Sequence, residues 1–487
     1  MSDRESAVVA GVPQGLLVGG EWRPATGGAT FDVHDPSTGD VLTEVANASP
    51  DDGLTALDAA VETQPGWAAT APRERGEILR RAFELLHERV DDLALLMTLE
   101  MGKPLAESRG EIVYAAEFFR WFAEEAVRIH GDYRVAPAGD RRILTLQQPV
   151  GPSVLITPWN FPMAMGTRKI GPAVAAGCTM VVKPASETPL SMLALAGVMA
   201  EAGLPDGVLN VVTTRSSGSV MEPLIRDPRA RKLSFTGSTS IGRRLVEQSA
   251  ESLLRVSMEL GGNAPFLVFA DADLDAAVDG AVQAKMRNVG EACTAANRFL
   301  VADEVADEFS SRLASRLSSM RVGRGTDEDV QVGPVITEKA RAEILELVAD
   351  ATDRGARVLA GGDALPGPGF FLAPTVLADV PADARVGSEE IFGPVAPVTR
   401  FATEDEALQL ANNTEFGLIA YAFTTDLARG LRVSEGLETG MVALNAGVIS
   451  NPAAPFGGVK HSGFGREGGR EGIAEYLETK YVGIGGL

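Results

Sequence analysis

GPSVLITPWNFPMAMGTRKIGPAVAAGCTMVVKP, residues 151–184, decides the fold class. Two short apolar runs, SVLITP and TMVVKP, stand on either side of a segment that reads as a helix after Pro162. Short apolar strands joined by a helix are typical of a parallel sheet that is buried on both faces. We therefore expect a unit of strand, helix and strand at the centre of an α/β domain.

The same alternation continues to about residue 262. It comprises the helix SMLALAGVMAEAG, the strands GVLNVV and RKLSFTG, a helix from Thr239 and the strand RVSMELGG. In a parallel, doubly wound sheet the ligand lies beyond the carboxyl ends of the strands. The loops TPWNFP, KPASETP, FTGSTS and ELGGN stand at those ends, so they are the first place to look for chemistry. No GxGxxG follows the first strands, so the ordinary dinucleotide fingerprint is absent.

The rest of the chain is organised around this unit. Residues 1–50 read as short strands and turns, and residues 50–126 have the apolar spacing of helices. Residues 131–150 predict two extended strands around a turn, which would form a projecting arm. From Asn263 the alternation resumes, which predicts a second α/β domain. One helix carries an aromatic face for which we expect a packed core: Tyr114, Phe118, Phe119, Trp121 and Phe122.

Composition argues against several classes of function. Forty-four basic and 66 acidic side chains give a formal charge of −22, which opposes binding to nucleic acid or to an anionic membrane surface. Two cysteines cannot form a disulfide framework, so we expect a cytoplasmic protein. Four scattered histidines without ligand spacing predict no metal site. We expect neither a secretion signal in MSDRESAVVAGVPQG nor a transmembrane segment.

One cysteine stands in a stretch that favours reactivity. Cys293 lies in RNVGEACTAANR among small or polar residues that would leave its sulfur reachable. A thiol is a nucleophile only as the thiolate, so other groups must activate it. The strand-end loops offer the carboxylate Glu259, the amide Asn160 and the amine Lys183. From the residues alone, a hydrolase or acyl transferase that uses cysteine and glutamate fits these parts equally well.

Seven motifs along nearly the whole chain carry a family resemblance. They are TPWNFP, VVKPASETP, FTGSTSIG, MELGGNAP, NVGEACTAANR, EEIFGPV and PFGGVKHSGFGREGG. In this order and spacing the chain resembles the aldehyde dehydrogenase superfamily, most closely its succinate-semialdehyde dehydrogenase branch. The resemblance implies an α/β fold with two doubly wound domains and a small β arm for oligomerisation.

The resemblance also assigns a role to each segment. It implies an NAD(P)-binding domain formed by residues 1–130 and 151–262. Residues 263–435 would form the catalytic domain with the nucleophilic cysteine. Residues 131–150 and 476–487 would be oligomerisation strands of a homodimer or homotetramer, and residues 436–475 would be a bridging segment with a substrate loop.

The family's chemistry implies three catalytic residues. Cys293 would add to the aldehyde carbon to form a thiohemiacetal, which loses hydride to leave a thioester. The side-chain amide of Asn160 and the backbone N–H of Cys293 would hold the oxyanion. Glu259 would act as the base that activates water for hydrolysis of the thioester.

The resemblance further implies NADP or NAD as cofactor. Lys183 would bind ribose hydroxyls, Ser238 the pyrophosphate, and Glu390 with Phe392 the nicotinamide ribose and ring. Where NAD-preferring members commonly have a glutamate, this chain has Ser186, which favours tolerance of NADP, although Glu187 would partly restore the repulsion of a phosphate. The full set of expected cofactor contacts is Ile156, Thr157, Pro158, Trp159, Lys183, Ser186, Glu187, Phe235, Gly237, Ser238, Ile241, Leu260, Glu390 and Phe392.

The substrate prediction depends on Arg168, Arg287 and Ser450. By resemblance these positions bind the distal carboxylate of a small dicarboxylic semialdehyde, for which a guanidinium fork is well suited. Oxidation of succinate semialdehyde to succinate is the expected reaction. Another aldehyde such as glutarate semialdehyde is the alternative, a CoA-acylating relative is disfavoured by Glu259, and a non-catalytic binding protein on the same fold is the alternative from another class.

Two positions depart from the family pattern. Glu291 stands where the family mostly has glutamine, and if ionised it would oppose formation of the Cys293 thiolate. Ala295 stands where some relatives have a second cysteine, so a redox switch by a local disulfide is not expected. The other cysteine, Cys178, is expected in the core.

Overall fold

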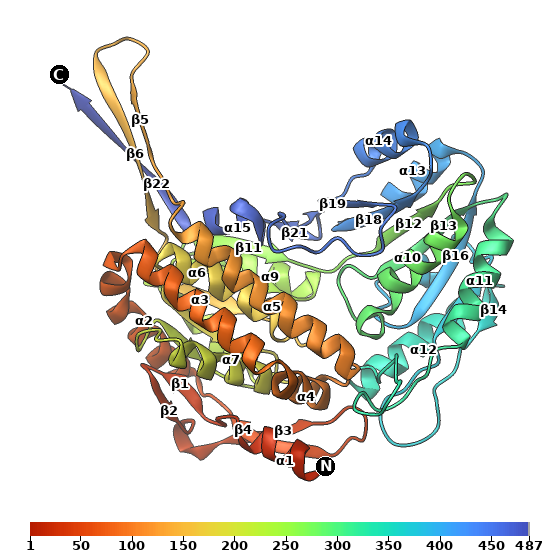
Figure 1. Ribbon diagram of the computed structural model, residues 1–487, viewed down its shortest axis with the longest axis horizontal. Helices are drawn as coiled ribbons and strands as arrows, with labels where there is room; N and C mark the ends of the chain where they lie inside the picture. The colour runs from red at the N-terminus through yellow and green to blue at the C-terminus, as the bar shows by residue number, and fades with distance from the viewer. Residues whose placement is uncertain (486–487) are drawn as a thin grey trace.

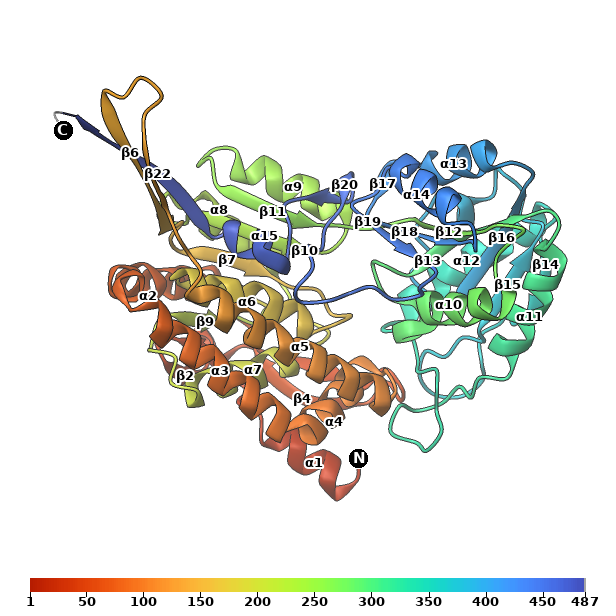
Figure 2. The same ribbon diagram turned by 45° about the horizontal axis from the view of Figure 1, so that its top comes forward.

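The chain folds into two α/β lobes and a β arm that projects from the first lobe (Figures 1 and 2). The computed structural model describes residues 1–485, so residues 486 and 487 of the predicted 476–487 strand lie outside the described part. Each lobe is built on its own sheet, of eight and seven strands respectively. The predicted α/β class with two wound domains and a small β arm is confirmed.

The first sheet has the strand order β2-β1-β9-β8-β7-β10-β11-β21. Its five central strands are parallel, since β7 pairs with β8 and β10, β8 with β9, and β10 with β11. They are β7 (Ser153–Ile156), β8 (Met180–Lys183), β9 (Leu209–Val211), β10 (Lys232–Thr236) and β11 (Arg255–Glu259). The antiparallel edges are β1 (Leu16–Val18), β2 (Glu21–Arg23) and β21 (Gly463–Phe464).

Helices cover both faces of this sheet, as its uninterrupted apolar strands require. One face carries α6 (Ala164–Ala176) and α7 (Pro189–Glu201), with α3 (Pro72–Glu88), α4 (Val90–Met101) and α5 (Leu105–Ala126) packed outside them. The other face carries α2 (Pro50–Ala69), α8 (Ser217–Arg226) and α9 (Thr239–Ser249). Two apolar cores therefore lie on opposite faces of one sheet.

The first fifty residues differ partly from their prediction as strands and turns. The strand pair β3 (Thr30–His34) and β4 (Val41–Ala46) is present, but the chain begins with the helix α1 (Asp3–Ala10). In this helix Ser2 and Glu5 form a capping box, in which each side chain bonds the backbone N–H of the other residue.

The second sheet has the order β14-β15-β16-β13-β12-β18-β19, all parallel except β14. Its strands are β12 (Ala264–Val268), β13 (Ala296–Ala302), β14 (Arg357–Ala360), β15 (Thr375–Ala378), β16 (Val395–Phe401), β18 (Ile419–Phe423) and β19 (Met441–Leu444). Its helices are α10 (Leu274–Met286), α11 (Ala306–Ser318), α12 (Glu338–Asp353), α13 (Glu404–Asn412) and α14 (Leu427–Gly436). Because β19 joins its edge, this sheet extends beyond residue 435.

After β19 the chain returns to the first lobe (Figure 2). The short strands β17 (Phe416–Gly417) and β20 (Val459–Lys460) pair, β21 joins the first sheet, and α15 (Gly469–Ala474) leads to β22 (Leu477–Gly485). Within the described residues, none of the helices is both long enough and apolar enough to span a membrane.

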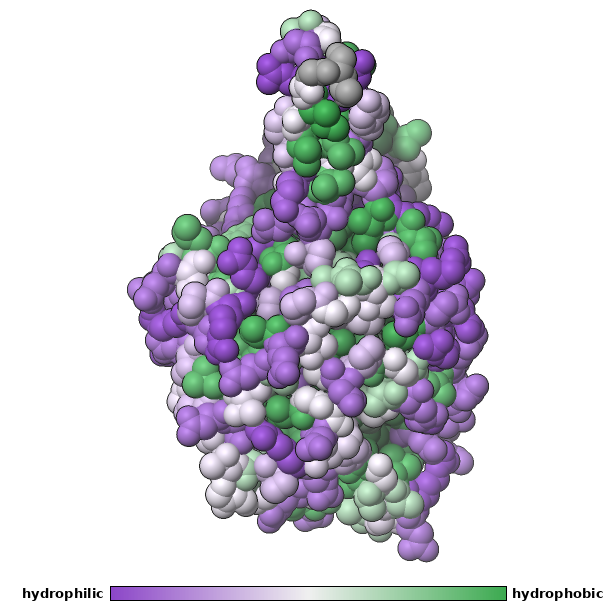
Figure 3. Space-filling view, turned by 90° about the vertical axis from the view of Figure 1, so that its left-hand side faces the viewer, coloured by the Kyte–Doolittle hydropathy of each residue, from purple (hydrophilic) through white to green (hydrophobic). Residues whose placement is uncertain are grey.

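The arm is an antiparallel sheet in the order β22-β6-β5. The predicted strands are β5 (Asp132–Val135) and β6 (Arg141–Pro149), and β22 pairs with β6 along its whole length. Hydrophobic side chains gather along the arm below its polar tip (Figure 3), and the exposed ones are Tyr133, Val135, Leu146 and Tyr481. Such a patch is typical of a protein interface.

Candidate active site

The candidate site lies where the two lobes meet. In the first sheet the strand order reverses between β7 and β10, and the loops after these strands form one wall of a cavity of about 260 Å³. Loops that precede β12, β13 and β16 of the second sheet form the opposite wall. The cavity thus lies between the carboxyl ends of one set of strands and the amino ends of the other.

Cys293 reaches this cavity from the loop before β13. The preceding residues Asn288, Val289 and Gly290 all have positive φ, a conformation that is strained for a β-branched valine. Gly262 passes so close that a Cβ atom there would lie 2.6 Å from the carbonyl oxygen of Cys293. The Tyr421 hydroxyl donates to the Thr294 carbonyl at 2.6 Å. These contacts hold the loop in one position, with the thiol half-buried rather than freely exposed.

Asn160 lies across the cavity from this loop. Its backbone oxygen accepts hydrogen bonds from Lys103 Nζ at 2.8 Å and Asn288 Nδ2 at 3.0 Å. Its side-chain Nδ2 donates to the Glu291 carbonyl at 2.9 Å. Because an amide nitrogen has two hydrogens, one remains for an oxyanion.

Glu259 is the last residue of β11 and lines the same cavity. Burial raises the pKa of its carboxyl well above the ordinary value, and the neighbouring carboxylate Glu467 adds to the rise, while Lys169 and Arg168 oppose it. Lys169 Nζ donates to Glu467 at 2.5 Å. Within residues 1–485, Glu259 Oε2 has no hydrogen-bond partner. The raised pKa makes this carboxylate a stronger base than an ordinary surface carboxylate.

The Cys293 thiol is neutral at rest. Burial raises its pKa to about 12, an effect that Arg168 and Arg287 reduce and that Glu390 and Glu259 increase. The free protein therefore holds Cys293 as the thiol, which would have to lose its proton before it could act as a nucleophile.

The side chain of Glu291 is buried and bonds the backbone. Its Oε1 accepts the backbone N–H of Ile336 at 3.0 Å, and its Oε2 has no partner within the described residues. Burial raises the pKa of this carboxyl well above the ordinary value, which favours the neutral form. The neutral form would not oppose formation of the Cys293 thiolate.

Tyr114 brings the two predicted substrate arginines together. Its hydroxyl accepts from Arg168 Nη2 at 3.0 Å, and the Arg287 guanidinium lies 5.9 Å from its ring centroid. Arg287 also lies 4.7 Å from the Phe161 ring, and Arg168 lies 4.2 Å from the Phe456 ring. The two guanidiniums thus lie against one group of aromatic side chains, close enough to Cys293 to lower the pKa of its thiol.

These arginines differ in their partners. Arg168 is 2% exposed, and its Nε lies 3.3 Å from Glu467 Oε2. Arg287 is half-buried and forms no ion pair or side-chain hydrogen bond within the described residues. Ser450 is half-buried in the loop after β19, and no hydrogen bond within residues 1–485 joins it to either arginine.

The residues present fit a dinucleotide. Lys183 is buried, and no group within residues 1–485 accepts a hydrogen bond from its ammonium; burial lowers its pKa to about 8. Ser238 is the N-cap residue of α9 but its side chain caps no backbone N–H, which leaves a free helix N-terminus for phosphate. Phe392 meets Trp159 edge to face, with ring centroids 5.5 Å apart.

The predicted site residues occupy three places. Ten line the cavity: Pro158, Trp159, Asn160, Gly237, Ser238, Glu259, Leu260, Cys293, Glu390 and Phe392. Ile156, Thr157, Phe235 and Lys183 are buried in or just beyond their strands, and Ile241 is 47% exposed on α9. Ser186 and Glu187 line a second cavity. Cys178 is buried, as expected for a core residue.

Sequence reasoning missed several residues. Tyr114 belongs to an aromatic helix face that was expected to be core, but its hydroxyl bonds an arginine of the site. Glu467 and Lys169 form a buried pair next to Glu259. Lys103 and Glu111 pair at 2.5 Å behind Asn160. Only the three-dimensional contacts show these roles, because each partner is distant in sequence.

Comparison with known proteins identifies the family. The aldehyde dehydrogenase family matches residues 22–482. A succinate-semialdehyde dehydrogenase of Paenarthrobacter nicotinovorans is 60% identical over 444 residues, which are 91% of this chain and 99% of the relative. A glutarate-semialdehyde dehydrogenase of Pseudomonas aeruginosa is 51% identical over 474 residues, which are 97% and 98% of the two chains. The crystal structure of an E. coli NADP-dependent enzyme is 53% identical, with a TM-score of 0.96, and the match covers 97% of this chain and 98% of that chain. The chain therefore belongs to the aldehyde dehydrogenase family.

Proposed function

We propose that the protein oxidises a small dicarboxylic semialdehyde, namely succinate semialdehyde to succinate, with NADP or NAD as the hydride acceptor. The observation that carries this proposal is the pair of guanidiniums at Tyr114, beside the thiol. Arg287 has no carboxylate partner within the described residues, so the carboxylate of a substrate could form the missing ion pair with its guanidinium. The aldehyde at the other end would then face Cys293.

The catalytic steps follow from the chain's own groups. Cys293 loses its proton to solvent water, and its sulfur bonds to the aldehyde carbon as the carbonyl π electrons move to the oxygen, which makes a thiohemiacetal oxyanion. The free N–H of Asn160 Nδ2 and the backbone N–H of Cys293 stabilise that oxyanion. A bound nicotinamide supplies the acceptor for the hydride. Collapse of the oxyanion leaves a thioester on the sulfur.

Glu259 completes the cycle. Its carboxylate takes a proton from a water molecule, which attacks the thioester and releases the acid and the thiol. Glu467 and Lys169, behind Glu259, hold charge next to it, so the base is neither free in solvent nor locked in an ion pair. This base for water makes hydrolysis, rather than transfer to CoA, the proposed outcome.

For the cofactor we propose contacts along the first lobe. Lys183 would bind the adenosine ribose, Ser238 the pyrophosphate, and Glu390 with Phe392 the nicotinamide riboside. With these roles, residues 1–130 and 151–262 form the cofactor domain and residues 263–435, whose sheet is extended by β19, the catalytic domain. Residues 436–475 connect them and include Ser450 on the substrate side.

For assembly and location we propose a cytoplasmic homodimer or homotetramer. The exposed apolar patch on the arm supports docking of a second copy, with the 131–150 and 476–487 strands at the interface. Both cysteines are free thiols, which suits a reducing compartment.

Steady-state rates with succinate semialdehyde, glutarate semialdehyde and propanal, each with NADP+ and NAD+, test the proposal. We expect the highest kcat/KM for succinate semialdehyde. Glutarate semialdehyde is the second candidate, because a relative with 51% identity is named for it. A preference for propanal that persists in Arg168→Ala and Arg287→Ala would refute the carboxylate pocket. Cofactor binding without reduction across the panel would favour a binding protein.

A further inference from the structure

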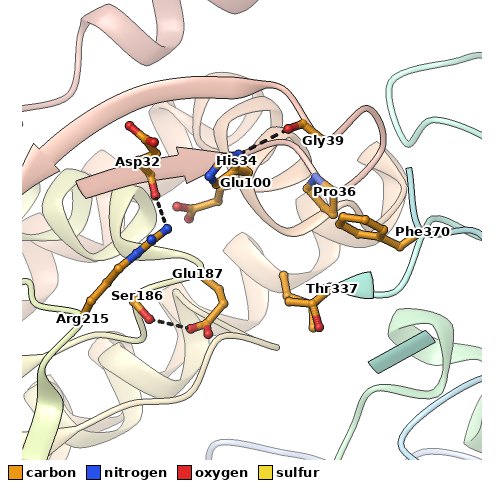
Figure 4. A pocket seen from close by; sticks show the side chains of 11 residues that line it. Asp32, His34, Pro36, Gly39, Glu100, Ser186, Glu187, Arg215, Thr337 and Phe370 are labelled. Atoms are coloured by element: carbon orange, nitrogen blue, oxygen red, sulfur yellow. Dashed lines mark hydrogen bonds between the residues drawn. The ribbon is translucent and has the colours of Figure 1, made fainter. Parts of the chain in front are cut away.

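A second cavity, of about 440 Å³, lies at the carboxyl edge of the first sheet (Figure 4). Two of its walls are the loops after β8 and β9, which are neighbouring parallel strands. The first loop carries Ser186 and the second carries Arg215. The strand β3, with Asp32 and His34, forms a third wall. The loops after adjacent strands thus enclose one space at the edge where ligands of wound sheets bind.

The guanidinium of Arg215 is held in place but has free donors. Its Nη2 donates to the backbone oxygen of Asp32 at 3.1 Å, and its Cζ lies 5.5 Å from the centroid of the Phe31 ring. Figure 4 shows the side chain extending from the wall of Ser186 towards β3. Within residues 1–485 no carboxylate forms an ion pair with it, and this is the one hydrogen bond from its five N–H groups.

Arg215, an exposed residue, is the only arginine or lysine among the described residues that line this cavity. The other ionisable residues in its described walls are His34 and the carboxylates Asp32, Glu100 and Glu187. Glu100 is occupied, because it accepts the backbone N–H groups of Leu190 and Ser191 at 2.7 and 2.8 Å. Without Arg215, the described walls of the cavity would contain no arginine or lysine to bind a dianion.

We propose that Arg215 is a specificity-determining residue that binds the 2′-phosphate of NADP, with the Ser186 hydroxyl as a second donor. The inference deepens the proposed function and rests on it, because that function places the adenosine ribose at Lys183, three residues before Ser186. A guanidinium fork suits a phosphate, and wound dinucleotide folds commonly use an arginine there.

Glu187 explains why NAD would still be tolerated. Its exposed carboxylate accepts the Ser186 hydroxyl at 3.2 Å, so it is close enough to the same site to accept a ribose 2′-hydroxyl. With the phosphorylated cofactor, Ser186 would turn its hydroxyl from Glu187 to the phosphate. The two cofactors thus use different neighbours in one pocket.

Titration calorimetry with the whole purified protein tests this assignment at the adenosine end alone. The dissociation constants of 2′,5′-ADP, 5′-AMP, NADP+ and NAD+ are compared for wild type, Arg215→Gln and Arg215→Lys. In Arg215→Gln we expect about tenfold weaker binding of 2′,5′-ADP and NADP+, the cost of one charge-assisted hydrogen bond, and unchanged binding of 5′-AMP and NAD+. Arg215→Lys keeps the charge, so its dissociation constants for 2′,5′-ADP and NADP+ should lie between those of wild type and Arg215→Gln.

The control variant is Arg316→Gln. It removes one exposed arginine from α11 in the other lobe, so it lowers the net charge equally without touching the cavity. Equal weakening of 5′-AMP and 2′,5′-ADP in Arg215→Gln, or no weakening of either, would overturn the assignment. If wild type binds 2′,5′-ADP through Arg215 but oxidises no aldehyde, the proposed function fails and the assignment stands. If wild type binds neither dinucleotide, both fail.

Discussion

Replacing Arg287 by glutamine should separate recognition of the substrate carboxylate from the chemistry at Cys293. Arg287 is half-buried over the Phe161 ring and forms no ion pair within the described residues, so its loss breaks no salt bridge, although it removes a positive charge that lowers the pKa values of Glu107 and Cys293. Arg168 is a poorer choice for the experiment, because it pairs with Glu467 and its removal would disturb the neighbourhood of Glu259. Arg287→Gln therefore tests the pocket with the least collateral change.

The expected loss follows from the position of the guanidinium. Two unit charges 4 Å apart at an effective dielectric of 20 interact by about 4 kcal/mol, which is an upper bound for this site. A half-buried group is partly screened by solvent, and charge-assisted hydrogen bonds contribute roughly 1.5–3 kcal/mol net. A loss of about 2 kcal/mol corresponds to about a 30-fold decrease in kcat/KM. Because the substrate carboxylate is remote from the reacting carbon, most of the decrease in kcat/KM should come from an increase in KM.

The assay compares succinate semialdehyde with butanal, which has the same four carbons but no carboxylate. Butanal should be oxidised equally well by wild type and Arg287→Gln, and Arg287→Lys should recover part of the loss because it keeps the charge without the fork. An equal decrease for both aldehydes would show that Arg287 supports the fold or the thiol rather than the substrate. No decrease for either would refute the carboxylate pocket.

Three further predictions concern the buried carboxyls and the thiol. Glu291→Gln should change kcat by less than about threefold and leave the pH profile of Cys293 alkylation unchanged. Since the folded pKa of Glu291 is raised, its contribution to stability is present below the ordinary carboxyl pKa and is lost as pH rises, so the variant should have the higher melting temperature at pH 8. Glu259→Gln should give one equivalent of reduced cofactor and then stop, in a stopped-flow trace; sustained turnover would exclude Glu259 as the hydrolytic base. Alkylation of Cys293 should accelerate steadily from pH 7 to about pH 10 because its pKa is raised to about 12, whereas buried Cys178 should not react; a plateau near pH 7 would contradict the neutral thiol.

The fold was predictable because the strands of the first sheet are buried on both faces. Strands such as β7 and β8 are buried at every position, so they consist of short, nearly continuous runs of apolar residues that can be recognised in the sequence. The arm was also predictable, but its third strand was not placed there by local pattern, because β22 is distant from β6 in sequence. Helix α1 was missed because few of its residues are buried and its apolar pattern is weak.

The site was less predictable from general rules. Strand-end reasoning points to the loops after β7, β10 and β11, which line the candidate cavity, but Cys293 and Glu390 precede strands of the other sheet. The two sheets are joined by the segment between β11 and β12, which runs from the carboxyl end of a strand in the first sheet directly to the amino end of a strand in the second. Small residues at 261 and 262 allow that passage, since a Cβ at Gly261 would lie 2.6 Å from Glu390 Oε2. Motif resemblance placed these residues where strand order alone would not.

The charges around the two cavities explain how a strongly acidic protein binds anions. Its formal charge of −22 repels anions at long range, so an anion must be attracted by nearby cationic side chains that no carboxylate of the protein neutralises. Lys103 and Lys169 are neutralised by their own carboxylates, Glu111 and Glu467. Of the four cations that we assign to ligands, Arg168 pairs with Glu467, whereas Arg287, Lys183 and Arg215 form no ion pair with a carboxylate within residues 1–485. Lys183 is buried and Arg287 half-buried, so their unpaired charges are costly, and a bound anion removes that cost; Arg215 is exposed and carries no such cost. The buried and half-buried cations that lack partners in the protein are therefore the ones through which ligand binding should stabilise it.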